Sequence, residues 1–305
     1  MTPPPRARTH PAASPRPTPG EPSLTSDHRT DEPATDTGGG LVRLRLDVAY
    51  DGTAFSGWAR QPGRRTVQAE VETALATVLR IPARLTVAGR TDTGVHATGQ
   101  VAHTDVPRAP WEDQGGRLVR RLRGVLPPDV AVPAVTEAPP GFDARFAALA
   151  RHYSYRLTDA DGGPPPLRRA DTVGWPRRLD AAAMADAAAL LLGQHDFAAF
   201  CRRREGATTI RTLLALSVAR EGDVVTVTAS ADAFCHSMVR SLVGALLAVG
   251  EGRRDPGWPA ELLDRRTRAD EVVVAPPGGL TLVRVDYPDD ADLAARVLQT
   301  RALRG

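Results

Sequence analysis

The sequence predicts an α+β fold with two similar halves, each a mostly antiparallel sheet with helices on one face. Three observations predict it. Runs with the two-residue period of a strand alternate with runs that have the helical period. The coarse order of strands and helices is the same in both halves of the chain, although no repeated residues align between them. Finally, Glu221-Gly222-Asp223 separates two apolar runs in the manner of an antiparallel hairpin.

The chain has 305 residues, 42% of them hydrophobic, which is enough for two domains with a substantial core. We expect residues 1–40 to form a disordered, proline-rich tail, because they hold nine of the 27 prolines and few large apolar side chains. Residues 41–149 are expected to form the N-terminal half and residues 150–290 the C-terminal half. A C-terminal tail follows at 291–305.

In the N-terminal half, residues 42–48 alternate apolar and charged side chains, which is typical of a strand with one wet face. Thr66 is the expected N-cap of a helix whose apolar positions, such as Val67, Val71 and Leu75, share one face. Further elements are expected as strands near 85–87 and 100–104 and a helix near 116–125.

The C-terminal half shows the same kinds of pattern. A strand is expected at 153–157, a helix rich in alanine and leucine at 180–192, a hairpin at 218–227, a helix at 236–249 and a strand at 280–285.

Charge alone says little about partners. The net charge is +3, and all 39 basic residues are arginine, a bias that a GC-rich genome explains. Position is more informative: the helix expected at 116–125 carries Arg117, Arg120, Arg121 and Arg123. These arginines are either a solvated face or a track for phosphates.

Composition also bounds the cellular setting. No apolar run reaches the roughly 18 residues of a membrane span, and the first residues lack the apolar core of a signal peptide. We therefore expect a cytoplasmic protein without membrane contact. Cys201 and Cys235 are then expected to be two reduced thiols, although they could in principle pair.

The most unusual stretch is GRTDTGVHATG at residues 89–99. Three glycines in so short a span allow tight turns and close approach of a ligand to the backbone. A carboxylate, Asp92, and an arginine, Arg90, held in a loop between two strands are placed like a site. The same spacing also fits a plain inter-strand connection with Asp as a turn residue.

At this point the sequence resembles the TruA family of tRNA pseudouridine synthases, whose signature GRTDAGVHA differs here only by Thr93. The resemblance extends from about residue 41 to residue 288, in order. It includes segments 50–58, 142–146, 151–155, 195–197, 234–240 and 285–288.

The resemblance implies the pseudouridine synthase fold, with a catalytic cleft between the halves and Asp92 at its floor. It implies that Asp92 is the nucleophile, that Tyr153 lies against the target base, and that Arg240 is the basic partner of Asp92. It further implies a homodimer whose substrate is the tRNA anticodon stem-loop at positions 38, 39 and 40.

The chemistry of these residue types agrees. Moving uracil from an N1 to a C5 linkage involves no net redox change, so no cofactor is expected. Breaking the glycosidic bond builds positive charge at C1′, which a carboxylate can stabilise or trap. An arginine nearby favours the ionised carboxylate. Tyr153 could stack on uracil or move the C5 proton, and Arg90 could fill the space of an extruded nucleotide or hold its phosphate.

Three alternatives bear on this interpretation. His96 and His103 could join Asp92 and Asp105 as metal ligands, but their spacing matches no common metal pattern and we expect no metal. A non-catalytic RNA-binding module is disfavoured by the absence of an aromatic RNP signature. A nucleoside or glycoside hydrolase would need a second acid beside Asp92.

Overall fold

The computed structural model describes residues 40–202 and 208–302. The predicted tail at 1–40 therefore lies outside the described residues, apart from Gly40. Within the described part of the chain, no helix is long and apolar enough to cross a membrane.

Ten strands of the described chain form one sheet, with eight of them in the order β4-β1-β3-β10-β5-β9-β8-β7. Short β2 pairs with β3, and β6 pairs with β5. The bounds are β1 (Leu41–Tyr50), β2 (Thr86–Val87), β3 (His96–Pro107), β4 (Val130–Glu137), β5 (Ala150–Thr158), β6 (Val173–Gly174), β7 (Gly193–Asp196), β8 (Ile210–Glu221), β9 (Val224–Ala231) and β10 (Leu280–Asp286).

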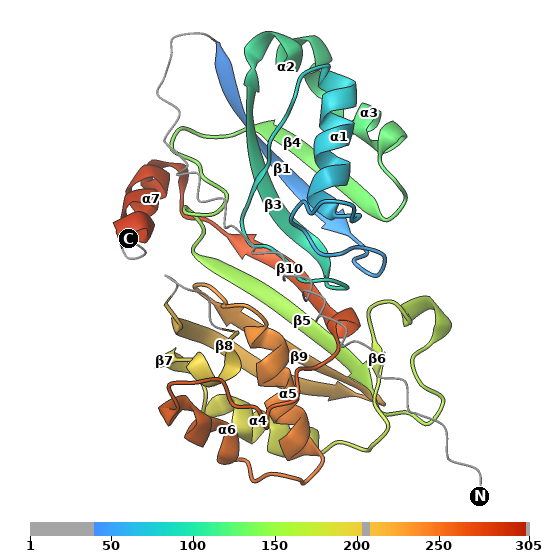
Figure 1. The fold of residues 1–305 in the computed structure, drawn as a ribbon, viewed down its shortest axis with the longest axis vertical. Helices are drawn as coiled ribbons and strands as arrows, with labels where there is room; N and C mark the ends of the chain where they lie inside the picture. The colour runs from blue at the N-terminus through green and yellow to red at the C-terminus, as the bar shows by residue number, and fades with distance from the viewer. Residues whose placement is uncertain (1–39, 203–207, 303–305) are drawn as a thin grey trace, which may run out of the picture. The chain divides into compact units, whose positions relative to one another are not determined.

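The sheet is mostly antiparallel, as predicted. The two parallel pairings in the described chain are β3 with β10 and β5 with β6. Strand β10 comes late in the sequence but lies between β3 and β5, so it joins strands from both predicted halves (Figure 1). The predicted hairpin is confirmed as β8 and β9, which pair antiparallel from Glu221 and Val224 outward.

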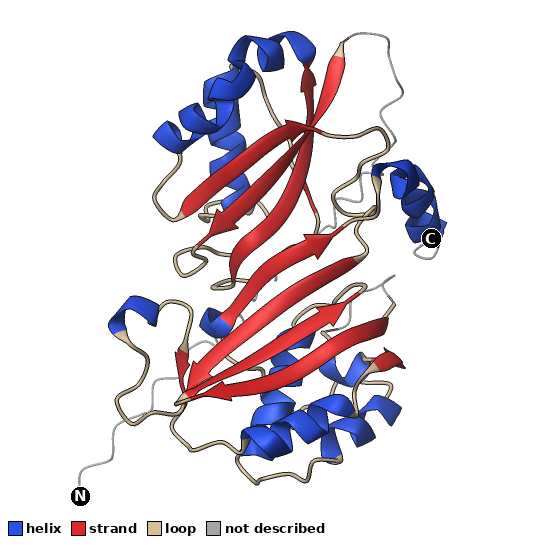
Figure 2. Cartoon of the chain, turned by 180° about the vertical axis from the view of Figure 1, so that it is seen from behind, coloured by secondary structure: helices blue, strands red, loops and turns tan. Residues whose placement is uncertain are grey.

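The helices cover one face of this sheet. Figure 2 shows the strands in front of α1, α3, α4 and α5 when the molecule is seen from behind. The bounds are α1 (Val67–Leu79), α2 (Arg108–Gln114), α3 (Leu118–Val125), α4 (Ala181–Ala189), α5 (Met238–Gly250), α6 (Trp258–Glu261) and α7 (Leu293–Ala302). The predicted mixed fold with helices on one face is thus confirmed.

The core lies between the helices and the sheet because apolar residues repeat with the right period in both. In β1 each second residue is buried, from Val42 to Tyr50, while Arg43 and Arg45 point to the open face. Helix α5 is apolar on all sides, and Arg240 is its one residue that is not buried. Each fully buried leucine in such a core contributes about 2 kcal/mol.

Several predicted boundaries were wrong. Strand β3 begins at His96, four residues before the predicted strand, because its first residues pair with both β1 and β10. Helix α5 begins at Met238, so Cys235 and His236 precede the helix instead of opening it. The α2, β4 and α7 elements were not predicted at all. Thr66 stands at the N-cap of α1, but its side chain makes no capping hydrogen bond to any described residue.

Candidate active site

Asp92 lies in the loop between β2 and β3, and the preceding residue is tied to the core. The Thr91 hydroxyl is 2.8 Å from the phenol oxygen of Tyr50, and the Trp58 amide donates to the Thr91 carbonyl at 3.0 Å. Gly57 packs so closely under the loop that a β-carbon there would lie 2.8 Å from the Thr91 carbonyl oxygen. The backbone before Asp92 is therefore held from two directions.

The turn after Asp92 is equally constrained. The Val95 amide donates to the Asp92 carbonyl at 3.1 Å, which closes a tight turn over Gly94. Gly94 has φ of +77°, a conformation that favours glycine, and its amide donates to the Phe55 carbonyl at 3.3 Å. Gly94 of the motif is thus required by the turn that presents Asp92.

Arg240 reaches Asp92 from the first turn of α5. Its Nη1 lies 3.8 Å from Asp92 Oδ2, and its Nε donates to the Ala275 carbonyl at 2.7 Å. The Ala275 amide in turn donates to the Arg240 carbonyl at 3.0 Å. Arg240 is therefore fixed through both its side chain and its backbone to one residue of the segment before β10.

The pair of Asp92 and Arg240 is half-buried, with side chains that are 29% and 18% exposed. Burial lowers the pKa of Arg240 from its ordinary value, and the nearby Asp92 carboxylate opposes that shift. Arginine stays protonated under such conditions because its guanidinium is not deprotonated in proteins. The half-buried guanidinium of Arg240 therefore places a fixed positive charge beside the Asp92 carboxylate.

Tyr153 is a buried residue of β5, 9% exposed, and it faces the helix side of the sheet. Its ring meets Phe234 edge to face, with 5.2 Å between ring centroids. Burial raises the pKa of the Tyr153 phenol, and Tyr50 and Asp92 raise it further, so the phenol is neutral at pH 7. Tyr155, two residues on, is buried on the same face and donates to the Pro276 carbonyl at 3.0 Å.

Comparison with known proteins decides the family. A family model described as tRNA pseudouridine synthase matches residues 187–288. The tRNA pseudouridine synthase A of Frankia casuarinae is 64% identical over 267 residues, which are 87% of this chain and 96% of that protein. The chain belongs to the tRNA pseudouridine synthase A family.

Other members of the family are nearly as similar. The tRNA pseudouridine synthase A of Streptomyces griseus is 55% identical over 87% of this chain and 95% of its own length. The Mycobacterium leprae protein of the same name is 54% identical over 86% of this chain and 96% of its own length. The family is one of isomerases, so the chain is an enzyme of that class.

The structure brings three of the four residues singled out from the sequence into one region. Asp92 and Arg240 come from opposite halves of the chain and form an ion pair. Tyr153 contacts Phe234, which lies in the segment that leads to Arg240, and the Asp92 carboxylate raises the pKa of the Tyr153 phenol. Arg90 is exposed on the same loop, two residues before Asp92.

Sequence reasoning missed two residues that lie beside Asp92, namely His236 and Ser237. His236 Nε2 lies 3.4 Å from Asp92 Oδ1, and Ser237 Oγ lies 3.4 Å from Asp92 Oδ2. A signal was available, because both fall inside the segment 234–240 that already contained Arg240. His236 was considered only as a base for Cys235, a pair that the expected helix disfavours, and Ser237 only as a departure from the family pattern, so neither was connected with Asp92.

Arg151 is a further residue whose position the sequence did not reveal. It is a buried arginine whose guanidinium donates to three backbone carbonyls: Ala88 at 2.9 Å, Arg145 at 2.9 Å and Asp232 at 2.7 Å. Ala88 leads into the Asp92 loop, and Asp232 precedes Phe234. Arg151 thus connects two of the segments that build the site.

The two histidines considered as metal ligands, His96 and His103, accept hydrogen bonds from backbone amides. His96 Nδ1 accepts from the Gly52 amide at 3.0 Å, and His103 Nδ1 accepts from the Ala144 amide at 3.0 Å. Burial lowers the pKa of His103 to about 4, so this ring is neutral. Among the residues described, no cluster of three histidine, cysteine or acidic side chains could hold a metal ion.

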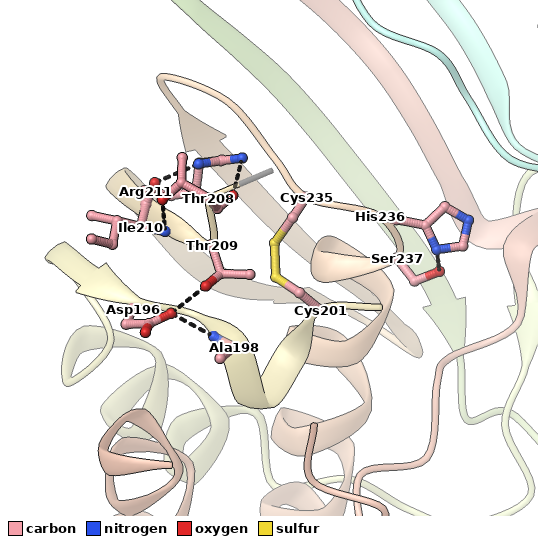
Figure 3. The surroundings of a disulfide bond; sticks show 10 residues. All are labelled: Asp196, Ala198, Cys201, Thr208, Thr209, Ile210, Arg211, Cys235, His236 and Ser237. Carbon is pink, nitrogen blue, oxygen red and sulfur yellow. Dashed lines mark hydrogen bonds between the residues drawn. A yellow bond between two sulfur atoms is a disulfide. The ribbon is translucent and has the colours of Figure 1, made fainter. Parts of the chain in front are cut away.

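The expectation of two reduced thiols was wrong, because Cys201 and Cys235 form a disulfide (Figure 3). Their α-carbons are 5.7 Å apart, within the usual range for such bonds. Their sequence separation of 34 gave no hint of contact. The fold brings them together by placing the turn after η3 (Ala198–Phe200) beside the segment that enters α5.

Proposed function

We propose that this chain isomerises uridine to pseudouridine in tRNA, with Asp92 as its catalytic carboxylate. The observation that carries the proposal is the pairing of Asp92 with Arg240 at 3.8 Å, in a chain 64% identical to a tRNA pseudouridine synthase A. The carboxylate in the strand-linking loop can stabilise the positive charge that cleavage of a glycosidic bond builds at C1′, and the fixed cation from α5 holds that carboxylate in place.

The reaction balances without any added reactant. The bond between C1′ and N1 breaks, the uracil turns over, and a bond forms between C1′ and C5. The hydrogen leaves C5 as a proton, and N1 ends protonated. Asp92 faces the positive charge that develops at C1′ and stabilises or traps it. Because uridine and pseudouridine are isomers, the proposal includes no cofactor and no metal.

The other residues have separate roles in this proposal. Arg240 places a fixed positive charge beside Asp92 and helps to orient its carboxylate. Tyr153, neutral and buried, offers an aromatic surface or a phenol to the uracil. Arg90 is exposed on the loop and meets the RNA where the target nucleotide leaves its stack, since a stacked base must be extruded before it can react.

The proposal also extends to substrate and assembly. The substrate region is the anticodon stem-loop at positions 38, 39 and 40, and two copies of the chain form a homodimer that holds the RNA. The arginines around α3, including Arg120 and Arg123, supply exposed positive charge for phosphates. A tRNA substrate places the enzyme in the cytoplasm.

The test is tritium release from tRNA carrying 5-tritiated uridine. We expect release by the unaltered protein and a loss of at least about 10³-fold for Asp92→Ala and Asp92→Asn. Asp47→Asn is the matched control, because Asp47 lies on the open face of β1, and it should release tritium normally. Mapping of pseudouridine on the product RNA then tests the anticodon positions.

The other outcomes would reject the proposal in distinct ways. Release of free uracil would identify a hydrolase. Binding of tRNA without tritium release by any variant would identify a binding module. Full activity of Asp92→Asn would remove Asp92 from the chemistry.

A further inference from the structure

Asp92 has two polar neighbours whose role the proposed chemistry leaves open. His236 Nε2 is 3.4 Å from Asp92 Oδ1, while Ser237 Oγ is 3.4 Å from Oδ2. Arg240 approaches Oδ2 as well, at 3.8 Å. His236 therefore faces the oxygen of Asp92 that Ser237 and Arg240 do not approach in these contacts.

The backbone of these two residues is held unusually firmly. The Arg202 amide donates to the His236 carbonyl at 3.1 Å, and the Met238 amide donates to the Cys235 carbonyl at 3.1 Å. The disulfide of Cys235 with Cys201 lies one residue before His236 (Figure 3). The segment 235–238 is thus tied to the turn after η3 by a covalent bond and a hydrogen bond.

Ser237 adds an independent sign of constraint. Its φ is +64°, and of the described residues other than glycine only Arg80 shares this left-handed conformation. Such a conformation costs free energy for a residue with a side chain, and it persists where the surroundings enforce it. In this conformation the side chains of His236 and Ser237 both lie beside Asp92.

The donors and acceptors of His236, Ser237 and Asp92 are compatible with the contacts between these side chains. Figure 3 shows His236 Nδ1 meeting Ser237 Oγ, at 3.2 Å. With a proton on Nε2, the imidazole donates towards Asp92 Oδ1. Ser237 has one hydroxyl hydrogen, which it directs to Nδ1 or to Asp92 Oδ2. Each oxygen of Asp92 therefore has its own polar neighbour in addition to Arg240.

We propose that His236 is a positioning residue for the catalytic reaction, which orients the Asp92 carboxylate through a hydrogen bond from Nε2 to Oδ1. This inference rests on the proposed role of Asp92. Arg240 and Ser237 both contact Oδ2, so without His236 the carboxylate could rotate about its terminal bond, whereas a donor on Oδ1 fixes the plane of the group. Misplacement of a reacting group by about 1 Å can lower turnover by about 100-fold.

The experiment compares two substitutions of similar size. His236→Gln keeps an N–H donor near the place of Nε2, whereas His236→Met fills the space without a donor. Initial rates of tritium release at varied tRNA concentration give kcat and KM for each. We expect His236→Met to lower kcat about 10-fold to 100-fold with KM within about twofold, because the contact matters to the reacting carboxylate and not to tRNA binding. His236→Gln should recover most of that loss.

His195→Met is the matched control. His195 lies on β7, where its ring contacts the Leu192 carbonyl, and the substitution should leave both kcat and KM unchanged. Melting temperatures of all three variants show whether a fall in kcat reflects loss of folded enzyme. If His236→Met is partly unfolded at the assay temperature, the proposal is tested by comparing kcat of His236→Gln with that of the unaltered protein. A 10-fold lower kcat in His236→Gln would overturn the proposal.

Other results would also overturn it. Unchanged kcat in His236→Met would show that the donor is not needed, and equal losses in both variants would show that donation from this place is not the function. A rise in KM alone would place His236 in RNA binding. If the unaltered protein releases no tritium, or Asp92→Asn is active, then the proposed function has failed, and not this inference alone.

Discussion

At the scale of single residues, the site depends on an arginine that is fixed before any substrate arrives. Arg240 is the one unburied residue of an otherwise buried helix, and its Nε and its carbonyl both bond to Ala275. With Nε bound to Ala275, Nη1 of the guanidinium lies towards Asp92. The planar fork of arginine makes this division possible, because its donors point in fixed and different directions.

Arg240→Lys should therefore lower kcat by at least about 10-fold, with tRNA binding largely retained. Lysine keeps the charge but cannot bond to Ala275 and meet Asp92 at once. The measurement is kcat from tritium release together with a filter-binding Kd for tRNA. Unchanged kcat would show that charge alone is sufficient, and a large rise in Kd would place Arg240 in RNA binding instead.

At the scale of elements, the position of α5 is set by a close approach of backbone to backbone. A β-carbon on Gly244 would lie 1.7 Å from the Val273 carbonyl oxygen, which glycine alone avoids. The chain from Val273 to Ala275 is the same segment that holds Arg240. Helix packing and the geometry of the site are thus coupled through a few residues.

Gly244→Ala should destabilise the fold by at least about 2 kcal/mol and lower kcat, because the helix and this segment must move apart. Gly124→Ala makes the same change in α3, where no atom lies within 4 Å of the new β-carbon. This control should stabilise the protein by up to about 1 kcal/mol, since alanine favours helix more than glycine does. Urea unfolding measures both, and equal stabilities would contradict the packing argument.

The disulfide acts at the same scale, because it links the turn after η3 to the entry of α5. Reduction should lower the free energy of unfolding by up to about 4 kcal/mol, the chain-entropy value for a closed loop of this length. Thiol labelling of the unfolded protein should find no free thiol before reduction and two afterwards. Two labelled thiols without reductant would show that the bond is not formed in the isolated protein.

At the scale of the whole molecule, every residue proposed for catalysis lies between β1 and β10. Deletion of residues 2–40 should leave the melting temperature and kcat nearly unchanged. Deletion of residues 293–305 is the contrast, because it removes Leu293, which is 1% exposed and part of the core. Only the second deletion should lower the melting temperature in a thermal scan, and a fall with the first would make the N-terminal segment part of the fold.

Much of this architecture was predictable because it repeats a simple period. The strand β1, the helix α1 and the hairpin β8–β9 follow directly from alternation, helical spacing and a polar turn. The α2 helix was missed because Pro110 and Trp111 interrupt its short sequence, and β4 because Pro133 lies within it. Both elements form because contacts with neighbouring parts of the fold outweigh the unfavourable local sequence. The local sequence pattern does not show these contacts.

The site was predictable to a similar extent. The motif around Asp92 and the resemblance to a known family identified Asp92, Tyr153 and Arg240 as candidates. His236 and Ser237 were missed although they lie in the same segment as Arg240, and the contacts of Arg151 with three backbone carbonyls had no signal in the sequence. Backbone constraints such as φ of +64° at Ser237 leave no pattern in the letters.

The place of β10 has a consequence for how the protein is made. Asp92 is synthesised in the first third of the chain, but the strand that joins its half of the sheet to that of Tyr153 begins at Leu280. At a synthesis rate of about 5–20 residues per second, roughly 10–40 s pass between the two events. A ribosome-bound chain therefore carries a complete loop motif long before the sheet can close around it, and the active arrangement can form only after β10 has been synthesised.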